Sequence, residues 1–145
     1  MFEKLYSLVE NNAGTAVINN PLIAPKFHAA VINDATSSII EVIKSQLESG
    51  KLKDLVKYFQ LSGVYDNPLI NSAVNKFAIK LDKYYDIPSV QAKQISNELI
   101  RPVMQELIRQ SKTEQNKEFA LTTLLSKISG QVADMGLLIA QLKIA

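Results

Sequence analysis

Two amphipathic helical patterns separated by a four-residue break constrain this chain more than any other feature. The first pattern follows Asn67 and Pro68, a polar residue suited to capping a helix and a proline suited to its first turn. Its apolar positions recur mostly at steps of three and four residues, the period of one helix face: Ile70, Ala73, Val74, Phe77, Leu81 and Tyr84. This pattern predicts a helix from residue 68 to about residue 85 or 86.

The second pattern follows the break at 86–89. Either Asp86 or Ser89 can cap the next helix, because a short side-chain oxygen accepts hydrogen bonds from the first free amides. Its apolar stripe is carried by Val90, Ile95, Leu99, Val103 and Leu107. Pro102 falls inside the stripe and removes one backbone donor, so we expect a kink or a restart around 100–102.

Helical patterns account for the rest of the chain as well. They predict a short helix ending near residues 11–12, a helical turn or an extended piece at 13–18, a loop at 19–25, a long helix opened by Pro25 and stopped by Gly50, and a short helix at 51–60. No stretch reads as a strand. We therefore predict a single all-α domain over residues 1–145 with about six to seven helices.

The C-terminal segment, 113–144, carries a heptad pattern. Ser111 and Glu114 have the spacing of a capping box, which predicts that a helix begins there. That helix either continues through Gly130 or ends there and folds back. The apolar positions then alternate steps of four and three residues: Leu121, Leu125, Ile128, Val132, Met135, Ile139 and Leu142. Such a seam must be buried, either in the chain's own core or at an interface between copies.

The composition excludes several kinds of chemistry. The chain has no cysteine, which excludes disulfides and thiolate sites and fits a cytoplasmic location. The N-terminal residues lack the apolar run of a signal peptide, and no apolar stretch approaches the length of a membrane span. His28 is the only histidine, so one chain cannot form a multi-histidine metal site.

Two pairs of acids have the i, i+4 spacing of one helix face: Asp82 with Asp86, and Glu114 with Glu118. Neither pair has a histidine or a third acid at helical spacing to complete a site. The five glycines form no phosphate-binding motif. We therefore predict no enzymatic activity, no metal and no cofactor, while a small-molecule ligand between helices stays open.

DNA binding is the alternative function that the sequence suggests. The helix, break and helix at 68–101 have the outline of a helix-turn-helix. Its second helix would present Gln91, Lys93, Gln94, Asn97 and Arg101. Phosphate contacts dominate affinity for DNA, however, and this helix has few basic residues. The net charge is only +2, with three lysines against five acids in residues 1–50 and thirteen basic residues against nine acids in 51–145.

A family resemblance covers the run from Gly50 to Ser111. Its features, in order, are Lys51–Leu55 after a glycine, the Asn67-Pro68 helix that ends at Ile87-Pro88-Ser89, and a helical stretch at Arg101–Met104. This run resembles the YidB-like family of small bacterial proteins. The resemblance implies a homeodomain-like helical core over roughly 50–111 and no established activity. We therefore predict a structural role or a protein–protein contact through the helical surface, with another protein or with a second copy.

Overall fold

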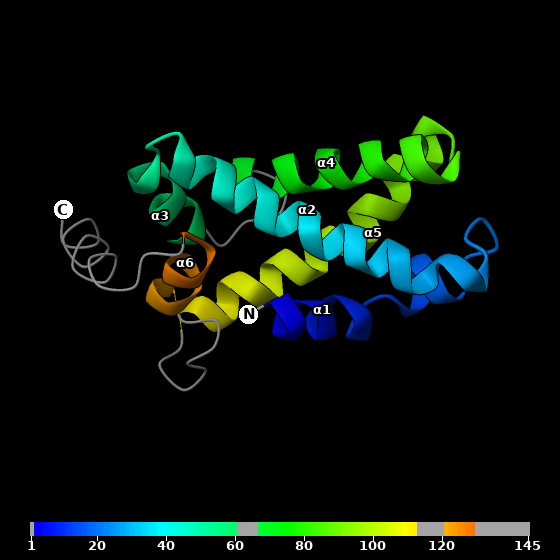
Figure 1. Ribbon diagram of the computed structural model, residues 1–145, viewed down its shortest axis with the longest axis horizontal. Coiled ribbons are helices and arrows are strands. Elements are labelled where there is room, and N and C mark those ends of the chain that lie inside the picture. The colour runs from blue at the N-terminus through cyan, green and yellow to red at the C-terminus, as the bar shows by residue number, and fades with distance from the viewer. Residues whose placement is uncertain (1, 61–66, 113–120, 130–145) are drawn as a thin grey trace.

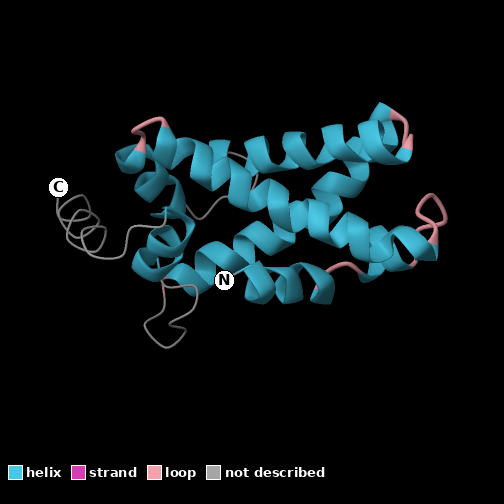
Figure 2. Cartoon of the chain, viewed as in Figure 1, coloured by secondary structure: helices cyan, strands magenta, loops and turns pink. Residues whose placement is uncertain are grey.

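The computed structural model describes residues 2–60, 67–112 and 121–129, and these residues are helical or in loops, with no strand among them (Figure 2). The predicted all-α class and single domain are confirmed. The elements are α1 (Phe2–Asn11), the π-helical turn η1 (Gly14–Ile18), the 3-10 turn η2 (Pro25–Phe27), α2 (His28–Glu48), α3 (Leu52–Gln60), α4 (Pro68–Tyr85), α5 (Ser89–Ser111) and α6 (Leu121–Ser129).

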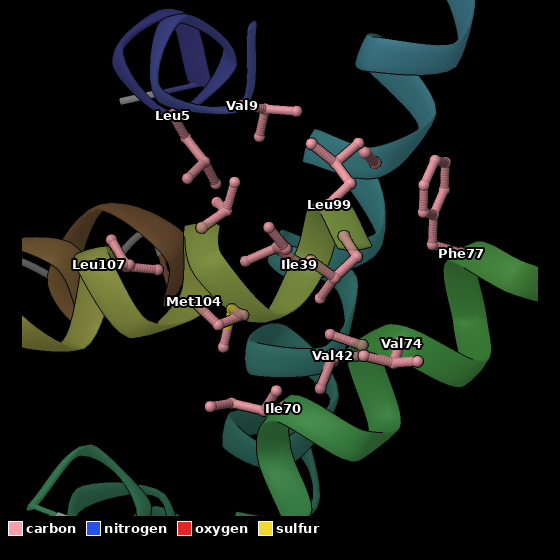
Figure 3. Packing of buried hydrophobic residues seen from close by; sticks show 14 of the residues in the cluster. Leu5, Val9, Ile39, Val42, Ile70, Val74, Phe77, Leu99, Met104 and Leu107 are labelled. Carbon is pink, nitrogen blue, oxygen red and sulfur yellow. The ribbon is translucent and has the colours of Figure 1, made fainter. Parts of the chain in front are cut away.

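The helices enclose one hydrophobic core (Figure 1). Helix α2 crosses the middle of the molecule and contacts α1, α3, α4 and α6, while α4 packs most extensively against α5. Figure 3 shows apolar side chains of four helices meeting there, among them Leu5 of α1, Ile39 of α2, Phe77 of α4 and Met104 of α5. All four side chains are fully buried, so the predicted apolar stripes converge on a common interior.

The predicted ends of two helices are confirmed. Gly50 has φ +72°, the left-handed conformation that follows the last turn of α2. Asn67 precedes α4, and its side-chain oxygen accepts a hydrogen bond from the amide of Leu69 at 3.0 Å. Pro68 occupies the first turn of α4, as its fixed φ favours.

The turn between α4 and α5 differs from the prediction. Asp86 adopts the left-handed conformation with φ 53°, and the amide of Ile87 donates back to the carbonyl of Leu81 at 3.4 Å. Asp86 therefore ends α4 instead of capping α5. Ser89 does not cap α5 either, because its hydroxyl donates to the carboxylate of Asp82 at 3.2 Å. Pro88 precedes α5 without any side-chain cap.

Helix α5 continues through Pro102 from residue 89 to residue 111, so of the two predicted alternatives, a kink or a restart, the restart is wrong. Proline at this position cannot donate to the carbonyl of Glu98. Both Glu98 and Pro102 lie on the exposed side of the helix, where water can replace the missing donor. The helix also extends over Ser111, whose hydroxyl donates to the carbonyl of Ile108 at 2.6 Å. Ser111 thus lies in the last turn of α5, and Glu114, its predicted partner in a capping box, lies outside the described residues.

Two apolar residues assigned to the stripes lie on the surface instead. Val90 is 77% exposed, because the buried face of α5 begins at Ala92 and Ile95, on the other side of the helix. Tyr84 is exposed as well, and the neighbouring Tyr85 turns towards α2 in its place. A turn and an extended piece were both open for residues 13–18, and the structure has the π-helical turn η1 over Gly14–Ile18.

Candidate interaction surface on the α4–α5 hairpin

Helices α4 and α5 form an antiparallel hairpin. The hydroxyl of Ser96 donates to the carbonyl of Val74 at 2.6 Å, and the guanidinium of Arg101 donates to the side chain of Asn71 at 3.0 Å. Along α5 the residue number rises while that of its partner on α4 falls, so the two helices lie side by side over several turns. A helix-turn-helix instead sets its two helices at about 90–120° to one another.

A third bridge between the helices lies nearer the turn, where the ammonium of Lys93 donates to the side-chain oxygen of Asn75. The contact of Ser89 with Asp82 forms a fourth, next to the turn itself. The Lys93–Asn75 and Ser89–Asp82 contacts lie on the exposed outer side of the hairpin, whereas the Ser96–Val74 bond is buried among the apolar residues that face the core.

The five residues predicted to contact nucleic acid do lie on the outward side of α5. Gln91, Lys93 and Gln94 are exposed, whereas Asn97 and Arg101 are half-buried. The side chain of Asn97 donates to the carbonyl of Lys93 at 3.0 Å and accepts from Arg101 at 2.7 Å. Both basic side chains of this set are thus held by asparagines of the hairpin itself.

An open pocket of about 420 Å³ lies between these bridges on the outer side of the hairpin. We call it the hairpin groove and define it by the six residues that line it: Asn75, Ala78, Ile79, Asp82, Ser89 and Lys93. A cation, Lys93, and an anion, Asp82, take part in the two polar bridges, and Ala78 and Ile79 supply the apolar part of the wall. The groove can therefore contact both charged and apolar groups of a bound molecule.

Three members of the groove were not predicted from the sequence as site residues: Asn75, Ala78 and Ile79. The most informative of them is Ile79. It is 64% exposed, although it belongs to a large apolar residue type. The signal was available, because Ile79 stands four residues from Asn75 and four from Lys83, on the polar side of the predicted helix. An apolar residue on the polar side of an amphipathic helix is expected to lie at the surface.

The residues of the predicted C-terminal interface divide into two groups. Leu125 is fully buried in the chain's own core, and Ile128 packs against that core on α6, which contacts α2. At these two positions the seam packs in the chain's own core. The side chain of Leu121 and residues Val132, Met135, Ile139 and Leu142 lie outside the described residues, as does the path of the chain at Gly130.

The other titratable side chains considered for a site form hydrogen bonds within the chain. A ring nitrogen of His28 lies 3.2 Å from the carbonyl of Ile23. The phenol of Tyr85 donates to the carboxylate of Asp34 at 2.5 Å. Burial, the larger cause, and this hydrogen bond, the smaller one, raise the pKa of Tyr85 above its ordinary value. Within the described ranges no three His, Asp or Glu side chains come together as a metal site would require. Glu114 and Glu118 lie outside those ranges.

Comparison with known proteins adds no relative. No protein-family model, no curated protein and no solved structure matches this chain. Among the described helices, none has the length and apolar character that crossing a membrane requires. The hairpin groove and its surroundings are therefore the observations on which a function can be argued.

Proposed function

We propose that this chain is a non-catalytic helical protein that acts by binding a protein partner through the hairpin groove. The observation that carries this proposal is Ile79, a large apolar side chain 64% exposed beside a charged pair in an open pocket. Protein interfaces combine an apolar centre with a polar rim that fixes orientation. The groove supplies both elements on one rigid pair of helices.

The contacts of the titratable groups support a non-catalytic role. The perturbed pKa of Tyr85 follows from its burial and its bond to Asp34, and that of Glu106 from hydrogen bonds donated by Arg109 and Gln110. Each shift thus has a cause in contacts that join or brace helices. A catalytic site, in contrast, groups an acid, a base or a nucleophile around a place where substrate can bind.

DNA binding through α5 is the weaker proposal. The antiparallel hairpin keeps α5 alongside α4, whereas a recognition helix must project into the major groove. Arg101 is engaged by Asn71 and Asn97, so phosphate binding at this residue would have to displace these contacts. Membership of the YidB-like family and a cytoplasmic location are proposals too, supported by the features of 50–111 and by the absence of cysteine.

Site-specific photo-crosslinking in the producing cells tests the proposed function. A benzophenone amino acid is placed at Ile79, and in the control at Leu22, which is 51% exposed and lies outside the groove. We expect a discrete crosslinked protein band for position 79 and none of comparable yield for position 22. Equal yields at the two positions, or no band at position 79, would overturn the proposal.

A further inference from the structure

The two charges of the hairpin groove lie at opposite ends of the groove along the hairpin. On α4, Asn75, which holds the ammonium of Lys93, and Asp82 are seven residues apart, about 10 Å of helix. Ile79 lies between them on the same helix. The groove therefore has a cationic end away from the turn, an apolar middle, and an anionic end at the turn. Lys83 and Asp86 are both exposed near the turn, and their opposite charges leave Asp82 as the charge that faces the groove at that end.

We propose that the partner bound in the hairpin groove is a second copy of this chain, an inference that rests on the proposed function. A two-fold axis through the middle of the groove exchanges its two ends. The anionic end of one copy then faces the cationic end of the other, so that Asp82 meets Lys93 of the partner subunit and the reverse pair forms as well. The charge order is thus complementary to itself in this orientation.

The apolar residues fit the same arrangement. Ile79 lies between the charged ends, so a two-fold axis there brings it against its symmetry mate and removes both side chains from water. Val90, 77% exposed on the outward side of α5 one turn before Lys93, extends the apolar surface beyond the groove. Stable interfaces bury about 800 Å² on each partner, which requires the outer faces of both helices around the groove as well.

Solution mass by light scattering over a concentration series tests this arrangement, with the intact chain and three variants. Lys93→Asp places one carboxylate against Asp82 of the partner subunit at each end, and Asp82→Lys places two ammonium groups together at each end. The double variant Asp82→Lys with Lys93→Asp restores opposite charges across the two-fold axis. The helix dipoles favour both changes, since Asp82 lies near the end of α4 and Lys93 near the start of α5.

We expect a concentration-dependent dimer whose dissociation constant rises about tenfold or more in each single variant and returns towards the wild-type value in the double variant. Lys44→Asp serves as the control, because Lys44 is an exposed residue of α2, outside the groove, that pairs with Glu48. A monomer at every concentration, or a dimer that none of the three variants changes, would overturn the proposal. So would a double variant that dimerises no better than the single ones.

A second pair of variants covers the case in which a charge reversal disturbs folding. Ile79→Ser and Leu22→Ser both replace exposed apolar residues, and thermal unfolding of each checks the fold. Only Ile79→Ser should weaken the dimer, and equal effects of the two variants would contradict the arrangement. If the chain is monomeric while position 79 crosslinks to a different protein, the second copy is wrong and the proposed function stands. If the chain is monomeric and position 79 crosslinks to nothing, both are wrong.

Discussion

Asn67 satisfies backbone groups at the ends of two different helices with one fully buried side chain. Its oxygen accepts from the amide of Leu69 in the first turn of α4 at 3.0 Å, and its amide nitrogen donates to the carbonyl of Tyr58 at 2.9 Å. Tyr58 belongs to the last turn of α3, where carbonyls have no intrahelical donor. Asn67 therefore caps the start of α4 and the end of α3 together.

Replacing Asn67 separates the two contributions. Asn67→Ala removes the cap of α4, which costs about 1 kcal/mol, and leaves the carbonyl of Tyr58 without its donor, which costs about 1 kcal/mol more. The expected loss in the free energy of unfolding is therefore about 2 kcal/mol. Asn67→Ser keeps an oxygen that can cap α4 but has no group that reaches Tyr58, so its expected loss is about 1 kcal/mol.

Urea unfolding followed by circular dichroism measures these free energies by linear extrapolation. Asn33→Ala is the matched control, because Asn33 is an exposed residue of α2, where the change should stay within about 0.5 kcal/mol. An Asn67→Ala variant as stable as the wild type would refute the capping role. Equal losses for the serine and alanine variants would show that the bond to Tyr58 contributes nothing.

Three further predictions follow from single contacts. Asp86→Gly should raise the free energy of unfolding by about 0.5 kcal/mol, because glycine adopts the left-handed conformation without a Cβ clash, and a lower urea midpoint would contradict this. Hydrogen bonds from Arg109 lower the pKa of Glu106 from 4.5 to about 2, so the stability from this pair is present above pH 4.5 and is lost as the pH falls towards 2. Because both side chains are partly exposed, Glu106→Gln should lower the free energy of unfolding by at most about 0.5 kcal/mol near neutral pH and should not change it near pH 2. Thermal melts that show the same difference between the variant and the wild type at both pH values would refute this. Phe77→Ala should cost about 3–5 kcal/mol in urea unfolding while Ile79→Ala costs less than about 0.5 kcal/mol, and similar losses would contradict their assignment to core and surface.

The sequence predicted those parts of the fold that depend on local backbone chemistry. Asn67 and Pro68 begin α4 and Gly50 follows α2, since a capping oxygen, a fixed φ and a left-handed φ are properties of single residues. The apolar period likewise placed Phe77 and Leu99 in the core, because a helix face is set by spacing alone.

The errors occurred where a contact outside the regular helix pattern decides between local alternatives. Ser89 has the residue type of a cap, but Asp82 takes its hydroxyl. Tyr84 and Tyr85 are equally apolar neighbours, and Asp34 on α2 determines which of the two turns inward. Pro102 suggested an interrupted helix, yet packing on both sides of it, at Ile100 and Val103, holds α5 continuous. Spacing along the chain contains no information about these partners.

The candidate site also depends on contacts that spacing along the chain does not predict. A helix, a short break and a second helix are compatible with an antiparallel hairpin and with a helix-turn-helix, and the pattern is the same in both. The contacts of Ser96 with Val74 and of Arg101 with Asn71 align α5 with α4. That alignment brings Asp82 and Lys93 to one groove beside Ile79. Of the side chains that made α5 resemble a DNA-reading helix, Lys93 and Arg101 therefore bond to α4, and the surface left for a partner is the groove between the helices.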